Sequence, residues 1–137
     1  MGDGAKYAGS IPDYLNVTVT SAVVSEGVVD LSTGEQDEDG DEIGVFQCCQ
    51  NCATVTLCQS LRKIGECAFW QCRSLVRVDI PPGVDEIGKR AFLHCHSLQD
   101  VTIPEGIVNL PDGVFYGCAA LKSIALPSSL RTIGDNA

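Results

Sequence analysis

Four cysteines between residues 44 and 60 are the first residues in this chain whose type and spacing could support chemistry. They are Cys48, Cys49, Cys52 and Cys58. The Cys49-x-x-Cys52 spacing is typical of zinc ligands and of redox-active thiols. Thiols packed in a hydrophobic core are the other interpretation, because a free cysteine behaves as a small buried hydrophobe. The choice depends on which elements carry these side chains.

Two histidines form a second group. His94 and His96 flank Cys95, and the chain contains no further histidine. A metal site needs three or four converging ligands, which this triplet does not supply. If Cys95 points inward, its two neighbours face solvent. We therefore predict no metal at the histidines and expect the chain to bind no cofactor.

Alternating acids form a third group, within residues 33–42. Asp37, Asp39 and Asp41 have the alternation of a calcium loop. In that loop, however, Glu42 occupies the place of the invariant glycine and Cys48 that of the bidentate glutamate. An acidic stretch without aromatic residues is more typical of a solvated linker. We predict a linker, with calcium as the alternative.

The remaining composition argues against catalysis and against nucleic-acid binding. The chain has no G-x-S-x-G, no glycine-rich phosphate loop and no H-E-x-x-H motif. Its formal net charge is −9, and all of it comes from residues 1–42, which hold ten acids and one base. Phosphate backbones require clustered Lys and Arg. We predict a non-enzyme that binds no nucleic acid and does not insert into a membrane.

An internal repeat organises the chain and must position these residues. Its period is 23 residues without gaps, and it covers residues 61–83, 84–106 and 107–129, with a partial copy at 130–137. A fixed period of this length indicates a solenoid. A degenerate copy at 38–60 precedes them, in which Phe46 aligns with Phe69 and Cys49 with Cys72. This alignment favours Cys49 and Cys52 as core thiols.

Each unit has a simple physical interpretation. The alternation in Leu75-x-x-Val78-x-Ile80 predicts a short strand with one buried face, which Pro81 ends because it has no N–H. Residues 66–69 can form one turn of helix or 3₁₀-helix. Stacked copies would place their strands side by side in a parallel sheet, with Phe69, Phe92 and Phe115 as an interior spine.

The repeat resembles the BspA-like leucine-rich repeat family. The residues that carry the resemblance are Ile64-Gly65, Ala68-Phe69, Cys72, Leu75, Val78, Ile80 and Pro81, with their counterparts in the next two copies; the third copy has Pro111 in place of Gly. The resemblance implies an α/β repeat solenoid, mostly strand and turn with short helical or 3₁₀ turns and a short parallel sheet on its concave face. It also implies adhesion or recognition roles, and it adds a capping disulfide to the alternatives for the first cysteines.

Concave faces of solenoids bind partners, and this defines the predicted binding residues. They are the outward-facing strand positions Thr54, Thr56, Arg77, Asp79, Asp100, Thr102, Ser123 and Ala125. A second row, Trp70, Leu93 and Tyr116, shares one repeat position and is either semi-buried packing or an apolar docking stripe. We predict a protein-interaction module; the alternative is a structural or accessory subunit of a larger assembly.

The N-terminal third is predicted to cap the repeats. Alternation in residues 14–20 and the apolar run 28–31 predict a hairpin or two edge strands, so that residues 1–37 form a cap with an acidic linker and residues 38–137 the repeats. Residues 1–12 lack the features of a signal peptide, which favours an intracellular location, with the cell surface as the alternative. The partial last copy predicts either a longer repeat protein or a partner that covers the C-terminal end.

Overall fold

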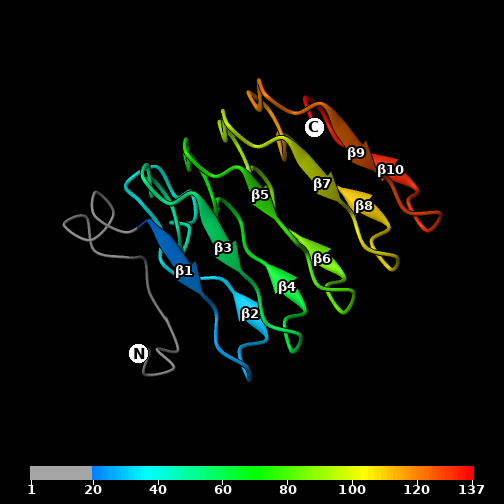
Figure 1. Ribbon diagram of the computed structural model, residues 1–137, viewed down its shortest axis with the longest axis horizontal. Coiled ribbons are helices and arrows are strands. Elements are labelled where there is room, and N and C mark those ends of the chain that lie inside the picture. The colour runs from blue at the N-terminus through cyan, green and yellow to red at the C-terminus, as the bar shows by residue number, and fades with distance from the viewer. Residues whose placement is uncertain (1–19) are drawn as a thin grey trace.

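The fold is a stack of coils, each containing two short strands, in a computed structural model that describes residues 20–137 (Figure 1). The first strands of the coils are β1 (Ser21–Val23), β3 (Thr54–Thr56), β5 (Arg77–Val78), β7 (Asp100–Thr102) and β9 (Ser123–Ala125). The second strands are β2 (Asp30–Leu31), β4 (Lys63–Ile64), β6 (Glu86–Ile87), β8 (Asn109–Leu110) and β10 (Thr132–Ile133). The predicted repeat solenoid is therefore confirmed.

The strands form parallel sheets that run along the stack. The first strands make one five-stranded sheet in the order β1-β3-β5-β7-β9, which we call the sheet wall. Its register keeps the period of the sequence, since Thr54 pairs with Arg77, Arg77 with Asp100 and Asp100 with Ser123. Equivalent residues of successive coils therefore lie directly beside one another.

The interior is a set of aligned apolar rows. The ring centroids of Phe46 and Phe69 lie 5.2 Å apart, those of Phe69 and Phe92 5.1 Å, and those of Phe92 and Phe115 5.4 Å, with nearly parallel planes. The predicted spine thus includes the degenerate first copy as well. Phe69 and Phe92 each lie between two other rings and bury both faces. Burial of large apolar side chains supplies most of the stability of such a fold.

The return segment of each coil is a chain of turns; together these segments (residues 44–49, 65–72, 88–95 and 111–118) form what we call the turn wall. The amides of Ala68, Trp70 and Cys72 each donate to the carbonyl three residues back. The intervening amides of Cys67, Phe69 and Gln71 donate to the next coil. This alternation replaces the expected helical or 3₁₀ turn, and no helix occurs in residues 20–137.

Left-handed residues make that alternation possible. Cys67 has a φ of 55° and Gln71 a φ of 57°, and their counterparts one coil later, Arg90 and His94, have 57° and 60°. Non-glycine residues adopt this conformation at a cost of about 1–2 kcal/mol each. The cost is offset because the rotated amides reach carbonyls of the next coil at 2.7–3.0 Å for residues 67, 69 and 71.

The repeated cysteine has a specific partner in the preceding coil. The thiol of Cys72 donates to the Phe46 carbonyl at 3.0 Å, and that of Cys95 donates to the Phe69 carbonyl at 3.1 Å. Cys118 repeats the contact with the Phe92 carbonyl at 3.1 Å. A small apolar side chain with a weak donor suits a buried position beside a backbone oxygen.

The sheet of second strands is interrupted at Pro111. It divides into a three-stranded part, β2-β4-β6, and a two-stranded part, β10-β8. In the intact parts the amides of Gly65, Gly88 and Gly134 donate to the preceding coil. Pro111 holds the same repeat position but has no N–H, so it cannot donate to the Ile87 carbonyl. This copy departs from the others, as predicted, and the physical reason is one missing ladder hydrogen bond.

Of the two arrangements predicted for the N-terminal cap, the structure has two edge strands, β1 and β2, and not a hairpin. Residues 14–19 of the expected first strand lie outside the described residues, but β1 and β2 do not pair with each other: β1 pairs with β3 and β2 with β4, both in parallel. They are the two strands of one further coil. Leu31 aligns with Ile64, an offset of 33 residues, whereas Phe46 aligns with Phe69, an offset of 23.

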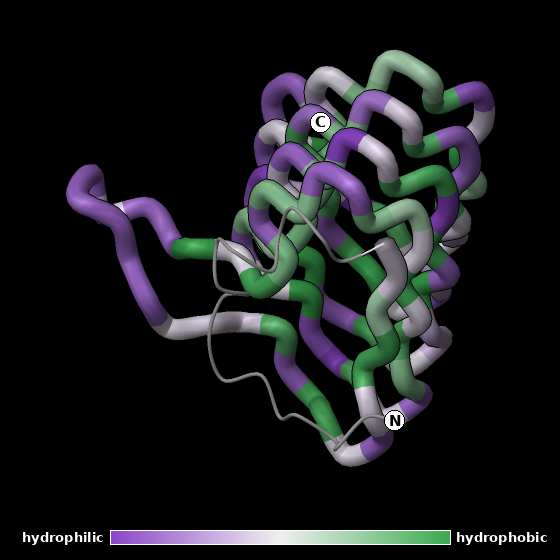
Figure 2. Tube along the Cα trace, turned by 60° about the vertical axis from the view of Figure 1, so that its left-hand side comes forward, coloured by the Kyte–Doolittle hydropathy of each residue, from purple (hydrophilic) through white to green (hydrophobic). Residues whose placement is uncertain are grey.

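The difference between these offsets identifies an insertion of ten residues inside the first coil. It corresponds to the predicted acidic linker, which is therefore a loop between β2 and Val45 rather than a connection between two units. Figure 2 shows this hydrophilic loop projecting from the side of the stack. Its base is closed by Thr33, whose hydroxyl donates to the Ile43 carbonyl, and by an antiparallel bridge between Gln36 and Glu42. Within residues 20–137, no helix is long and apolar enough to cross a membrane.

Candidate interaction surfaces

The sheet wall presents all eight predicted binding residues to solvent. Thr54, Thr56, Arg77, Asp79, Asp100, Thr102, Ser123 and Ala125 are each exposed. They form two columns, because residues two apart on a strand point to the same face and the parallel register aligns successive coils. The structure thus brings together the residues that the sequence proposed, although it does not test whether they bind a partner.

The chemistry of the sheet wall is polar and shallow. Arg77 forms an ion pair with Asp79, with Nη2 and Oδ1 3.0 Å apart, and the Ser123 hydroxyl donates to the Asp100 carboxylate at 2.8 Å. Threonine and serine side chains and Ala125 surround these charges. Such a face can form hydrogen bonds and ion pairs with another protein.

The turn wall carries the second predicted row. Trp70 and Leu93 are half-buried and Tyr116 is 51% exposed. The row therefore combines the two interpretations drawn from the sequence, because it packs on the coils at one end and is open at the other. The indole Nε1 of Trp70 is buried and has no hydrogen-bond partner among the described residues.

Two cavities lie along this row. The larger, of about 400 Å³, is lined by Arg90, Leu93, Asp112, Gly113, Tyr116, Asp135 and Asn136. The smaller, of about 210 Å³, is lined by Asp41, Cys67, Trp70, Arg90 and Leu93. Arg90 and Leu93 belong to both linings, so the two cavities are neighbours that share one wall. We call the pair the turn-wall groove.

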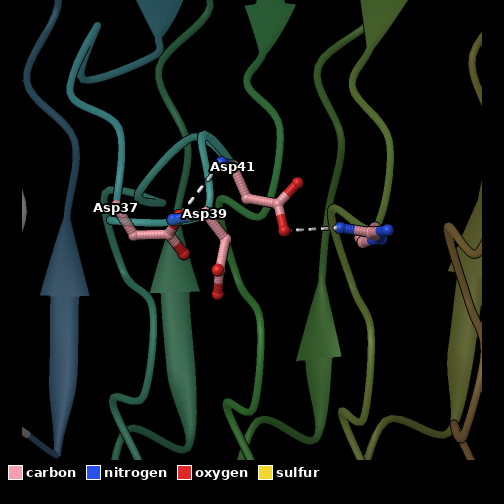
Figure 3. Close-up of polar contacts among 4 residues, drawn as sticks. Asp37, Asp39 and Asp41 are labelled. Atoms are coloured by element: carbon pink, nitrogen blue, oxygen red, sulfur yellow. Dashed lines mark hydrogen bonds and ion pairs between the residues drawn. The ribbon is translucent and has the colours of Figure 1, made fainter.

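The acidic loop reaches one end of this groove. Figure 3 shows that the Asp37 carboxylate accepts from the backbone amides of Asp39 and Asp41, each at 3.0 Å. These bonds direct the Asp41 side chain outward to Arg90, where Oδ2 and Nη1 are 3.2 Å apart. Among residues 20–137, no group of three or more His, Cys, Asp or Glu is arranged to hold a metal ion.

Six of the eight cysteine side chains are buried. No disulfide joins any of the eight cysteines. Cys49 and Cys52 are buried, as predicted, and Cys58 is buried as well. Burial raises the pKa of Cys67 to about 11 and that of Cys49 to about 12. A thiol with a raised pKa carries little thiolate at neutral pH and is a poor nucleophile.

His94 lies beside the aromatic row. His96 is exposed, as expected, but His94 is half-buried. Its ring meets the Tyr116 ring edge-on, with centroids 5.6 Å apart. The space comes from Gly117, where a Cβ would lie 2.3 Å from the His94 Nδ1.

The repeat pattern, the cysteine position and the phenylalanine spine together match a known family. Residues 42–137 match the BspA type leucine rich repeat region, in six copies. The chain belongs to the BspA-type leucine-rich repeat family. BspA-type repeats indicate a protein-interaction or surface-protein role, and proteins of this kind are typically non-catalytic.

Solved structures of leucine-rich repeat proteins share this fold. A Treponema pallidum (T. pallidum) leucine rich repeat protein is 23% identical, with a TM-score of 0.58, over 85% of this chain and 73% of that protein. A Bacteroides ovatus leucine-rich repeat protein is 24% identical, with a TM-score of 0.67, over 85% of this chain and 33% of that protein. A Faecalibacterium prausnitzii leucine rich cell surface protein is 24% identical, with a TM-score of 0.51, over 83% and 37%. No curated protein matches the chain significantly.

Sequence reasoning identified the acidic stretch but missed Arg90 and its contact with the acidic loop. The chain spans about a third of the length of two of these structures. The ten-residue insertion described above lies in its first coil. No sequence pattern indicates the contact between Asp41 and Arg90. The two residues are 49 positions apart in the sequence and meet only because the loop crosses the coil between them.

Proposed function

We propose that this BspA-type repeat unit is a non-catalytic interaction module that binds a protein partner through its sheet wall. The observation that carries the proposal is the pair of exposed columns formed by Thr54, Arg77, Asp100 and Ser123 and by Thr56, Asp79, Thr102 and Ala125. Their side chains differ from coil to coil, while the buried residues behind them repeat. This is the arrangement of a constant scaffold with a variable surface.

Rigidity supports this proposal. The backbone of each strand in the sheet wall is hydrogen-bonded to its neighbours, and Val78 and Val101 behind it are buried. A surface held in this way loses little conformational entropy on binding, which leaves more of the interaction energy for affinity. The charged residues Arg77, Asp79 and Asp100 lie at the middle of the columns and would set specificity through complementary charges.

The test is site-specific photo-crosslinking in cells that express the natural protein. A photoreactive amino acid at Thr102 lies on the sheet wall, and the same amino acid at Asn109, an exposed residue of β8, is the matched control. We expect a discrete crosslinked protein species from position 102 that is absent from position 109. The charge exchange Arg77→Asp with Asp79→Arg should abolish it. Crosslinking at 109 alone would contradict the proposal.

A further inference from the structure

The turn-wall groove has the features of a second binding site, independent of the sheet wall. Its floor is apolar, formed by Trp70, Leu93 and Tyr116, and its two cavities measure about 400 and 210 Å³. Cavities of a few hundred Å³ are large enough to enclose an apolar side chain. The half-buried state of Trp70 and Leu93 means that an occupant would meet surfaces that are already held in place.

The rim of the groove is acidic. Its lining contains the carboxylates of Asp41, Asp112 and Asp135 and the single guanidinium of Arg90. Asp41 belongs to a loop whose charged residues are all acids: Glu35, Asp37, Glu38, Asp39, Asp41 and Glu42. The field at the groove therefore attracts positive charge.

Arg90 shows that this rim can bind a cation. Its guanidinium is held by Asp41 at 3.2 Å, while both side chains remain about half exposed. An exposed pair of this kind contributes only about 0–1 kcal/mol. A basic side chain from another protein could therefore replace Arg90 at Asp41 at little cost.

The Trp70 indole favours a ligand that supplies a hydrogen-bond acceptor. Its Nε1 is buried and unpartnered in the described structure, and an unsatisfied buried donor costs roughly 1–3 kcal/mol. A bound polypeptide supplies a carbonyl oxygen with every residue, so a small reorientation of the ring would allow it to donate. An apolar ligand without an acceptor would leave the cost in place.

From these observations we infer that the turn-wall groove binds an extended segment of a partner protein in which an aromatic or aliphatic side chain is flanked by Lys or Arg. The apolar side chain would enter the cavity beside Leu93 and Tyr116. The flanking cations would lie against Asp41, Asp112 and Asp135. This inference does not rest on the proposed function of the sheet wall, and either surface could fail without the other.

The test uses the full chain and three short capped peptides of sequence Gly-Lys-Phe-Lys-Gly, Gly-Glu-Phe-Glu-Gly and Gly-Lys-Ser-Lys-Gly. Trp70 is the only tryptophan in the chain, so its indole NMR signal reports on the groove alone. We expect the Lys-Phe-Lys peptide to shift this signal saturably, and the other two to bind about tenfold more weakly or less. Equal shifts with the Glu-Phe-Glu peptide, or no shift with Lys-Phe-Lys, would overturn the inference.

Three variants sharpen this test. Tyr116→Ser removes an exposed apolar wall and should weaken Lys-Phe-Lys binding about tenfold, whereas Thr102→Ala on the sheet wall is the matched control and should not change it. Arg90→Gln removes the cation that competes for Asp41, leaves Lys89 at 3.9 Å from Asp112, and should strengthen binding a few-fold. If the groove residues only packed against the coils, Tyr116→Ser and Arg90→Gln would not change peptide binding in opposite directions. Weaker binding by Arg90→Gln, or an equal loss in Thr102→Ala, would overturn the inference.

Discussion

The sheet wall and the turn wall are built by the same repeat, yet they differ in backbone hydrogen bonding and in the side chains that they expose. In the sheet wall every strand bonds to its neighbours, and the exposed residues are mostly polar and vary from coil to coil. In the turn wall, alternate amides point along the stack and the left-handed residues Cys67 and Gln71 open the surface. One repeat therefore produces a flat polar face and a hollowed apolar one.

This difference teaches that repetition of sequence does not mean repetition of surface chemistry. The core rows are nearly invariant because each layer must match the next. The turn wall holds aromatic residues at a position that is only partly covered, as Tyr116 shows with 51% exposure. Contacts of different kinds are therefore available on two sides of one short stack.

The largest expected effect comes from the spine beneath the turn wall. Phe92→Ala removes a ring stacked on both Phe69 and Phe115, and such truncations cost about 3–5 kcal/mol. Val101→Ala, beneath the sheet wall, removes two buried methylene equivalents and should cost roughly 1.5–2 kcal/mol. Urea unfolding followed by circular dichroism measures both. Equal losses would mean that the two walls are packed alike.

The next effect tests how closely the coils approach each other where the turn wall begins. A Cβ at Gly88 would lie 2.4 Å from the Glu66 amide nitrogen, so Gly88→Ala forces two backbones apart and should cost about 1–3 kcal/mol. Gly106→Ala is a useful contrast, because its Cβ meets nothing within 4 Å and only the φ of 105° opposes it. A thermal melt of both variants separates crowding from backbone strain.

Alkaline pH should weaken the turn wall through Cys67. Burial raises the pKa of this thiol from 9.0 to about 11, so the unfolded chain loses the proton at a lower pH than the folded one. The stabilisation is complete below pH 9.0 and is lost as the pH rises to about 11. The melting temperature should fall in that window, and less steeply in Cys67→Ser. A parallel fall in both proteins would contradict this assignment.

A smaller effect is expected at the acidic loop. Asp41→Asn removes the ion pair with Arg90 and should change stability by only about 0–1 kcal/mol. Hydrogen exchange should nevertheless quicken in residues 35–43, because the loop loses its contact with the coil that contains Arg90. Asp39→Asn is the matched control, since its carboxylate makes no ion pair in the described structure. Equal changes in the two variants would show that only the loss of charge matters.

The smallest effect concerns the interruption at Pro111. Pro111→Gly supplies the missing amide, which can donate to the Ile87 carbonyl as Gly88 does to Ile64. One added hydrogen bond, worth about 1 kcal/mol, is largely offset by the freedom that glycine gains in the unfolded chain. We expect nearly unchanged stability but a slowly exchanging amide at residue 111 by NMR. Rapid exchange there would mean that β6 and β8 remain apart.

The repeated interior was predictable from the sequence because each layer copies the last. The period placed the strands, the Phe69–Phe92–Phe115 spine and the row of inward cysteines, all of which the structure confirms. The exposure of the sheet-wall residues followed from strand alternation alone. Helical turns were expected at 66–69, but Gly113 and Gly117 in the third copy already indicated left-handed positions at two points of that segment.

The surface was less predictable because it depends on contacts that no period encodes. The first coil was missed since ten inserted residues separate Leu31 from the copy to which it belongs. Without that coil, the acidic stretch looked like a linker and its contact with Arg90 could not be foreseen. The burial of Cys58 had a similar cause, because its thiol donates to the Val28 carbonyl of the missed coil at 3.3 Å.

The insertion in the first coil has a consequence for how such proteins can acquire new properties. Leu31 and Phe46 keep the places of Ile64 and Phe69 although ten additional residues lie between them. Since lengthening a closed loop costs only about 0.6 kcal/mol per doubling, the junction between a second strand and its return segment tolerates foreign sequence. It is therefore a natural grafting point, where evolution or a protein engineer can add a recognition loop while the scaffold stays unchanged.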